Sequence, residues 1–201
     1  MTPPLRIGIT GNIGAGKTTV CREFERLGVP VYYADLRAKL LMRDDHQLRT
    51  AISKRFGEQS YTTDGELNRP YLAERVFGHE AELADLNALV HPAVARDAAA
   101  WHAAQHHPYT LHEAAILYEI GASGGYDRIV VVACPRPMRI QRVMLRDGIA
   151  REAVESRMAR QWTDADKEAA GDYLIVNDGV KLILPQILRT DRLLRELAVR
   201  T

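Results

Sequence analysis

The sequence predicts an α/β fold built on a five-stranded parallel sheet. Two observations lead to this prediction. Short apolar segments alternate with helical segments along the chain, which is typical of doubly wound α/β folds. A complete phosphate-binding motif also lies between the first apolar segment and the first helix. With 201 residues, the chain is long enough for one such domain with an insertion.

The phosphate-binding motif is Gly11-x4-Gly16-Lys17-Thr18, and it directly follows residues 5–10, an apolar run that suits a buried strand. In a P-loop of this kind, backbone N–H groups surround phosphate oxygens and the next helix points its positive end at them. The lysine reaches the β and γ phosphates, and the threonine hydroxyl holds Mg²⁺. The strand before the motif and the helix after it favour a nucleotide site over a chance glycine turn.

The helix after the motif is predicted from Val20, Phe24 and Leu27, which recur at helical spacing, and Gly28 is placed to end it. Loop and first-turn residues are the expected nucleotide ligands, with Thr18 also the expected metal ligand. They are Asn12, Gly14, Ala15, Gly16, Lys17, Thr18 and Thr19.

The remaining four strands are expected at residues 29–33, 109–112, 128–133 and 173–176. In a parallel α/β sheet, ligands bind at the carboxyl ends of the strands. Four residues lie just past such ends and are therefore expected beside the P-loop. They are Asp35, Glu113, Pro135 and Asn177.

Residues 36–105 depart from the strand–helix alternation and predict a helical lobe inserted between two strands. Helices are expected at 36–42, 47–56, 69–76 and 80–101, with a turn at 63–65 and a break at Pro92. An insertion of this kind suggests a separate substrate-binding lobe.

Residues 138–170 form a second departure, which is helical by pattern and dense in charge. Arg139, Arg142 and Arg146 share one helix face, Gly148 interrupts the helix, and residues 152–161 resume it. Such charge usually marks a solvated helix face. Beside a P-loop it also suits a lid whose arginines exclude water and stabilise the transferring phosphoryl group.

The charge balance and the cysteines indicate where the protein works. The 27 Lys and Arg against 26 Asp and Glu give a net charge of +1, so we expect neither a nucleic acid nor a membrane as partner, although a local basic site stays open. Cys21 and Cys134 lack metal-binding spacing and suit a reduced compartment. Since neither a signal peptide nor a long apolar run is evident, a cytoplasmic protein is expected.

Three classes of P-loop protein compete for this sequence. A GTPase switch should carry Asn-Lys-x-Asp after a strand, and the chain has no such motif. A motor ATPase should end a Walker B strand in aspartate, whereas residues 129–133 end at Cys134-Pro135. A short chain with a helical insertion and an arginine-bearing lid favours a small-molecule kinase.

Motifs along nearly the whole chain resemble those of dephosphocoenzyme A kinases. The P-loop at residues 7–18 is similar to that of this family, as are Tyr33-Ala34-Asp35 and the segment Leu86–Pro92. The lid segment Gln141–Asp147, Gln161, and residues 172–179 with Asn177-Asp178-Gly179 also match in order and spacing.

The resemblance implies a P-loop kinase core with a five-stranded parallel sheet, a helical substrate-binding insertion and a helical lid. The core would comprise residues 1–35, 106–137 and 171–201, with 36–105 as the substrate lobe and 138–170 as the lid. The implied reaction transfers phosphate from ATP, with Mg²⁺, to the ribose 3′-hydroxyl of dephosphocoenzyme A, and we expect a monomer. Another nucleoside or small-molecule kinase, or a nucleotide switch without transfer chemistry, is the alternative.

Three residues depart from the family pattern. Where the family has Asp-x-Pro-Leu-Leu-x-Glu, this chain carries Glu113 in place of the aspartate and Ala115 in place of the proline. Asn12 replaces a common glycine, and asparagine is the non-glycine residue best suited to a positive φ there.

The resemblance assigns Asp35 to the 3′-hydroxyl as general base, whereas the local sequence fits equally an N-cap of the helix from Leu36. Lys17 and Arg142 are the other expected catalytic residues. Arg142 is the first choice for a lid arginine on the phosphates, Arg146 is second and Arg139 is third, with ordinary surface charge as their alternative. Arg146 and Asn177 join the expected nucleotide ligands, Asn177 at the adenine end.

Two histidine-containing patterns could mark a functional site, but each also has a structural interpretation. His91-Pro92 suits either the shaping of the substrate lobe or a structural turn. His102 and His106 have the spacing of a zinc-binding helix, but Ala103 stands where the glutamate of His-Glu-x-x-His would be, so zinc is not expected.

Overall fold

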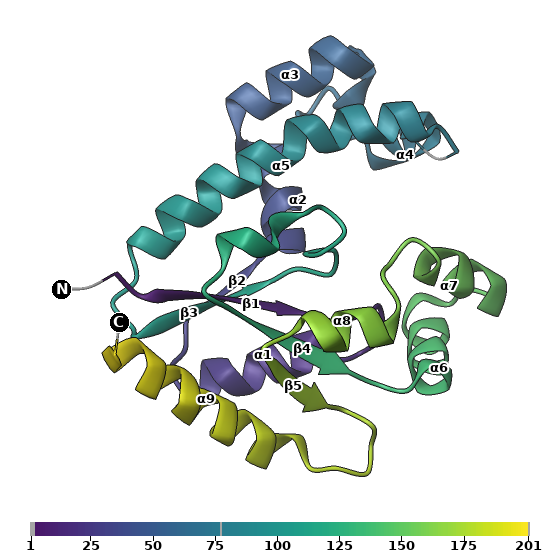
Figure 1. Cartoon of the computed structure of the whole chain (residues 1–201). Helices are drawn as coiled ribbons and strands as arrows, with labels where there is room; N and C mark the ends of the chain where they lie inside the picture. Colours follow the sequence, from purple (N-terminus) through teal and green to yellow (C-terminus); the bar gives the residue numbers. More distant parts are fainter. Residues whose placement is uncertain (1–2, 77, 201) are drawn as a thin grey trace. The chain divides into compact units, whose positions relative to one another are not determined.

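The computed structural model describes residues 3–76 and 78–200 (Figure 1). They form two compact units. The core unit runs up to Tyr33 and resumes at His102, and the helical unit comprises Ala34–Trp101.

The core unit is built on a five-stranded parallel sheet in the order β2-β3-β1-β4-β5. The strands are β1 (Leu5–Thr10), β2 (Val31–Tyr33), β3 (Tyr109–Glu113), β4 (Arg128–Ala133) and β5 (Tyr173–Val176). Ile7 of the central β1 pairs with Leu111 on one side and Arg128 on the other. The expected fold class is therefore confirmed. The strand ends differ slightly, because β2 begins at Val31 and Glu113 is the last residue of β3 rather than the first residue after it.

The two faces of the sheet are covered by different segments, as the alternation along β4 shows. Val130 and Val132 face a cluster that contains the buried side chains of α1 (Lys17–Arg26) and α9 (Ile183–Arg200). Ile129 and Val131 face the other side, where they pack against Leu117 from the turn after β3. Helices α1 and α9 lie side by side (Figure 1).

Helix α1 is amphipathic and begins at the P-loop. Val20, Cys21 and Phe24 are fully buried against the sheet. The helix ends at Arg26, two residues after Phe24, and Gly28 takes a φ of 83° in the turn that follows. This agrees with the end predicted from Gly28.

The charged segment after β4 folds as three short helices of the core unit, α6 (Arg136–Asp147), α7 (Arg151–Met158) and α8 (Asp164–Ala170). Gly148 ends α6 with a φ of 64°, as expected of a left-handed C-cap. Ile140 and Val143 of α6 pack against Val154 of α7, so the first two helices share a small apolar core.

The helical unit contains α2 (Ala34–Asp44), α3 (His46–Phe56), α4 (Arg69–Val76) and α5 (Glu80–Ala103). Its buried cluster is formed by Leu48, Ile52, Phe56, Leu72, Val90 and Ala93. The expected break at Pro92 is wrong, because α5 continues through that residue. Proline removes one N–H donor from a helix. The apolar residues on both sides of it, Val90 and Ala93, are buried in the same cluster, and this packing favours one continuous helix.

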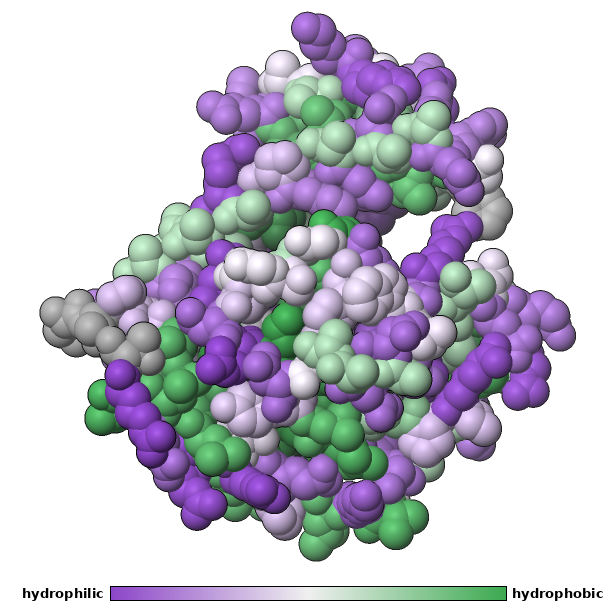
Figure 2. Space-filling model, viewed as in Figure 1, coloured by the Kyte–Doolittle hydropathy of each residue, from purple (hydrophilic) through white to green (hydrophobic). Residues whose placement is uncertain are grey.

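Several large apolar side chains of the core unit remain exposed near the start of α9. Hydrophobic atoms gather around the loop between β5 and α9 and the first turns of that helix (Figure 2), where the exposed residues are Val180, Leu182, Leu184 and Leu188. Among residues 3–76 and 78–200, no helix is both long and apolar enough to cross a bilayer.

Candidate active site

The P-loop conformation depends on its glycines. At Gly11, with a φ of 153°, a Cβ would lie 2.4 Å from the Val132 carbonyl oxygen. Gly14 and Gly16 have φ values of 81° and 90°, a region that side chains disfavour. A Cβ on Gly14 would lie 2.7 Å from the Arg139 carbonyl oxygen, and one on Gly16 would lie 2.2 Å from Asn177 Nδ2. The loop can therefore adopt this tight path only with glycine at these positions.

Lys17 lies across the P-loop and is almost fully buried. Its Nζ donates a hydrogen bond of 2.9 Å to the Gly11 carbonyl and lies 3.8 Å from Glu113 Oε1 at the end of β3. The lysine thus bridges the first residue of the motif and the neighbouring strand end. Glu113, although longer than the aspartate usual in the family, still approaches the loop lysine.

The first turn of α1 suits an anion and a divalent cation. Thr18 and Thr19 are exposed, and this turn contains no acidic residue that would oppose a phosphate. The backbone N–H groups at such a helix start bind phosphate oxygens. The accessible Thr18 hydroxyl is a hard oxygen ligand of the kind that Mg²⁺ uses, so the residues present fit the expected metal.

Asn177 and Arg142 both lie beside the loop. Asn177 Nδ2 donates to the Ala15 carbonyl at 2.8 Å, so the turn after β5 holds the middle of the P-loop. Arg142 Nη1 lies 3.3 Å from Cys134 Sγ and 3.7 Å from the position that a Cβ on Gly16 would take. Burial raises the pKa of the Cys134 thiol, so Arg142 faces a neutral sulfur.

The other two arginines of α6 occupy different environments. Arg139 is buried, its Nε donates to the Cys134 carbonyl at 2.9 Å, and its guanidinium forms an ion pair with Asp164. The surface-charge alternative is therefore wrong for Arg139, which is a structural link. Arg146 is exposed and pairs with Asp147, which also accepts from Arg157. A role of Arg146 on the nucleotide stays a prediction.

The backbone conformation of Asn12 differs from the positive φ for which the sequence suggested asparagine. No non-glycine residue in the described part of the chain has a positive φ, so the replacement of glycine by Asn12 does not use a left-handed conformation. Instead the side chain is buried, and its Nδ2 donates to the Trp162 carbonyl at 3.1 Å and to Asp164 Oδ1 at 2.6 Å.

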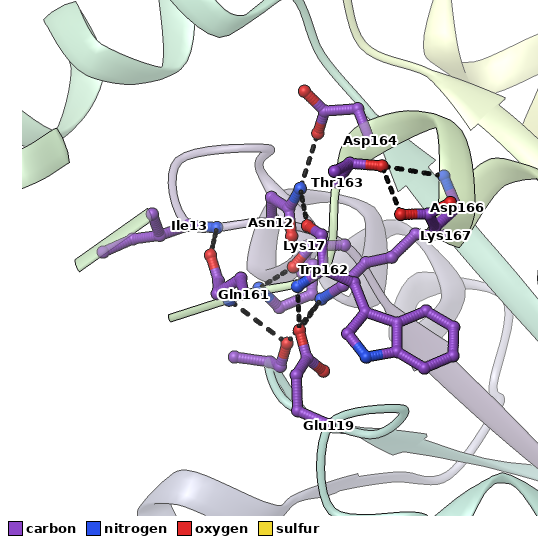
Figure 3. A network of polar contacts seen from close by, with 12 residues as sticks. Asn12, Ile13, Lys17, Glu119, Gln161, Trp162, Thr163, Asp164, Asp166 and Lys167 are labelled. Atoms are coloured by element: carbon purple, nitrogen blue, oxygen red, sulfur yellow. Dashed lines mark hydrogen bonds and ion pairs between the residues drawn. The ribbon is translucent and has the colours of Figure 1, made fainter. Parts of the chain in front are cut away.

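A network of polar contacts joins the P-loop to the segment that leads into α8 (Figure 3). Ile13 N donates to Gln161 Oε1 at 2.8 Å, next to the two bonds of Asn12. Lys167, buried in α8, forms an ion pair of 2.8 Å with Glu119 and donates to the Ala115 carbonyl. Burial acts to raise the pKa of Glu119, but the Lys167 ammonium and the Trp162 N–H outweigh it and hold that pKa below its usual range.

Sequence reasoning missed Asp164, Lys167 and the partner role of Glu119. Only their positions in the sequence could have pointed to them. Asp164 and Lys167 lie at the end of the charged segment, and Glu119 lies in the turn after β3. Nothing in the local pattern distinguishes these charges from solvated ones.

Asp35 belongs to the helical unit. Helix α2 begins at Ala34, so Asp35 is exposed in the first turn of the helix. The N-cap alternative is therefore wrong, because the cap of a helix precedes its first residue. Its assignment as the general base stays a prediction.

His91, His102 and His112 occupy regular helices and strands of the fold. His91 lies inside α5, so the turn interpretation of His91-Pro92 is wrong. His102 Nδ1 lies 2.7 Å from Thr110 Oγ1, and its ring contacts that of buried His112 edge-on. Within the described residues, no group of three or more His, Cys, Asp or Glu side chains is arranged to hold a metal ion.

Known proteins resemble this chain over most of its length. The family model described as dephospho-CoA kinase matches residues 5–182. A curated dephospho-CoA kinase from Salinibacter ruber is 42% identical over 176 residues, which cover 86% of this chain and 88% of the relative. One from Yersinia pestis is 35% identical over 180 residues, which cover 90% of this chain and 87% of the relative.

Solved structures agree with this result. A crystal structure from Thermus thermophilus aligns with a TM-score of 0.81 at 31% identity and covers 98% of this chain and 99% of its own. A dephospho-CoA kinase from Campylobacter jejuni shares the fold, with a TM-score of 0.65 at 18% identity and coverage of 96% and 98%. The match along residues 5–182 and the P-loop geometry lead to one conclusion: this chain belongs to the dephospho-CoA kinase family.

Proposed function

We propose that the protein transfers the γ-phosphate of ATP to the ribose 3′-hydroxyl of dephospho-CoA, which yields coenzyme A and ADP, the last step of coenzyme A biosynthesis. The observation that carries the proposal is the complete P-loop, with Lys17 held across it, in a chain of the dephospho-CoA kinase family. In the reaction, the bond between the γ-phosphorus and the β,γ-bridging oxygen breaks. A bond from the 3′-oxygen to that phosphorus forms, and the hydroxyl proton leaves.

The loop and the first turn of α1 would bind the triphosphate. Backbone N–H groups of the loop and of the first turn of α1 would donate to phosphate oxygens, although that of Ala15 already donates to the Asn12 carbonyl at 3.0 Å. Lys17 would exchange its bond with the Gly11 carbonyl for the β and γ phosphates. The Thr18 hydroxyl would hold Mg²⁺, which when bound neutralises charge on the phosphates. Asn177, which fixes Ala15, supports the loop on the side of β5.

Arg142 is the proposed arginine of the lid, residues 138–170. Its guanidinium lies next to Gly16, and within the described residues it forms a hydrogen bond to the neutral Cys134 thiol and no ion pair, so little electrostatic energy opposes its transfer to a phosphate. A cation placed where charge develops lowers the barrier to phosphoryl transfer. Arg146, already paired with Asp147, would contribute less.

Asp35 is the proposed base, and residues 36–105 the proposed substrate lobe. The support for Asp35 is its exposed position in the first turn of α2, directly after β2, and the family resemblance of the segment Tyr33-Ala34-Asp35. In a loose transition state, a carboxylate at the hydroxyl mainly orients the nucleophile and accepts its proton late.

One assay tests the proposal. The protein is incubated with ATP, Mg²⁺ and dephospho-CoA, and coenzyme A is detected by its mass. Formation of coenzyme A supports the proposed reaction. Transfer to a different nucleoside or small molecule would refute the acceptor but keep a kinase, and nucleotide binding without transfer to any acceptor would favour a switch.

The setting of the enzyme is part of the proposal. Two cysteines that are buried and free support a reducing compartment such as the cytoplasm. We propose a monomer, and the exposed apolar residues from Val180 to Leu188 are where self-association would form. Sedimentation at micromolar concentrations tests this point, and a dimer there would contradict it.

A further inference from the structure

We propose that Asn12 is a positioning residue that couples nucleotide binding in the P-loop to the base of the lid, the segment Gln161–Lys167. The proposal rests on the proposed function only in that an adenine nucleotide occupies the P-loop.

The Asn12 side chain makes the loop a partner of the lid base. Its Nδ2 donates both of its hydrogens, one to the Trp162 carbonyl at 3.1 Å and one to Asp164 Oδ1 at 2.6 Å. These partners lie 150 and 152 residues away in the chain. Since the residue is 6% exposed, water competes little with either bond. A glycine at position 12 could form neither.

The next loop residue contacts the same segment. Ile13 N donates to Gln161 Oε1 at 2.8 Å, while Gln161 Nε2 donates to the Ala115 carbonyl at 3.3 Å. Two consecutive residues of the P-loop are thus held by the lid base. A change of loop conformation when phosphate binds must be transmitted to Gln161, Trp162 or Asp164, or break these bonds.

The lid base is itself firmly anchored. Lys167 is 1% exposed and pairs with Glu119, which also accepts from Trp162 N at 2.9 Å. The Trp162 ring stacks on that of Tyr118, with centroids 5.2 Å apart. Because this end of the lid is fixed to the turn after β3, it serves as the support against which the loop is positioned.

Asp164 connects both ends of the lid. Its Oδ1 accepts from Asn12, and its Oδ2 forms the ion pair with buried Arg139 at the start of α6. Helix α6 also carries Arg142, one turn beyond Arg139 on the same face. A displacement of Asn12 would therefore shift Asp164 and, through Arg139, helix α6, which carries Arg142.

Asn12→Gly tests the proposal by removing the whole side chain. We expect the Kd of ADP, measured by calorimetry, to rise about fivefold to tenfold, because the loop loses the two Asn12 bonds to the lid base and the nucleotide must supply that part of its ordering. In the unaltered protein, ADP should slow hydrogen exchange of the amides of residues 161–167. In Asn12→Gly this protection should be lost.

Thr163→Ala is the matched control. The Thr163 hydroxyl caps α8 by accepting from Asp166 N at 3.1 Å, and its bonds in the described part of the chain are to Asp166 rather than to the loop. This variant should lower the Tm and leave the Kd of ADP unchanged. If Asn12 had a merely structural role, Asn12→Gly would behave like Thr163→Ala: the Tm would fall, while ADP affinity and the protection of residues 161–167 would be unchanged. That result would overturn the proposal.

A second variant keeps the test independent of glycine's extra backbone freedom. Asn12→Ala should show the same loss of affinity and protection, whereas normal values for Asn12→Ala would contradict the role of the amide. The proposed function is tested separately, by turnover of dephospho-CoA with the unaltered protein. Failure there leaves the ADP measurements interpretable.

Discussion

Removing one partner of the Lys167–Glu119 pair should destabilise the core unit strongly. The two side chains are 1% and 13% exposed, and Nζ lies 2.8 Å from Oε1. Lys167→Met leaves the Glu119 carboxylate largely buried without its charged partner, although the Trp162 N–H still donates to it at 2.9 Å. Breaking a buried pair in this way costs about 3–5 kcal/mol. We expect the lower end, about 3 kcal/mol, because Glu119 keeps some contact with water.

Urea unfolding at neutral pH measures this loss as a fall in the free energy of unfolding. For a chain of this size, about 3 kcal/mol corresponds to a fall in Tm of about 6–12 °C. The double variant Lys167→Met/Glu119→Leu should lose less than Lys167→Met alone, because no charge remains buried. Arg151→Ala, which removes an exposed pair with Glu155, is the control and should cost under about 1 kcal/mol.

The pH dependence gives an independent check on the pair. Because the pKa of Glu119 is held below its ordinary 4.5, the carboxylate stabilises the fold above that pH. This stability is lost as the pH falls through the lower pKa of the folded state. The difference in stability between the unaltered protein and Glu119→Gln should therefore be largest near pH 7 and should narrow below pH 4.5. A loss under about 1 kcal/mol in Lys167→Met, or a difference that does not vary with pH, would refute the reasoning.

Three further predictions concern the proposed catalytic residues and a buried histidine. Asp35→Asn should keep the Kd of ATP but lose most of kcat, while Asp44→Asn, exposed on the same helix, should behave normally; near-normal kcat in Asp35→Asn would reject its role. Arg142→Ala should lower kcat by about 10²-fold, and an unchanged kcat would make it an ordinary surface residue. Burial lowers the pKa of His112 to about 3, so below pH 6.5 the unfolded chain binds a proton that the folded protein does not. Between pH 6.5 and pH 5, the free energy of unfolding of the unaltered protein should fall by about 2 kcal/mol more than that of His112→Gln. If urea unfolding gave the same pH dependence for both proteins, the prediction would be contradicted.

Much of the core unit could be predicted from sequence because its signals are local. The β-branched run at 128–133 predicts a strand with the bounds that β4 has in the structure. Gly148 ends α6 at the residue where the sequence predicts a break. The P-loop combines residue identities that the loop geometry itself requires, as Gly14 and Gly16 show. These features depend on neighbours in the chain and are therefore readable from it.

The departures come from contacts between distant segments. Arg139 shares a helix face with Arg142 in the sequence pattern, but Asp164, 25 residues later, makes it a buried structural residue. Pro92 has a strong local tendency to break a helix, which burial of its neighbours overrides. Likewise, Asn12 is explained by partners that no local pattern identifies.

The central place of β1 in the sheet has a consequence for biosynthesis. Both neighbours of this strand come much later in the chain, and the bond from Arg6 N to Asp127 joins residues 121 positions apart. At about 5–20 residues per second, the ribosome needs about 6–24 s to make that length. Until β3 and then β4 are made, the backbone N–H and C=O groups along both edges of β1 have no neighbouring strand to pair with. The nascent P-loop segment should therefore be a chaperone client until both strands have emerged.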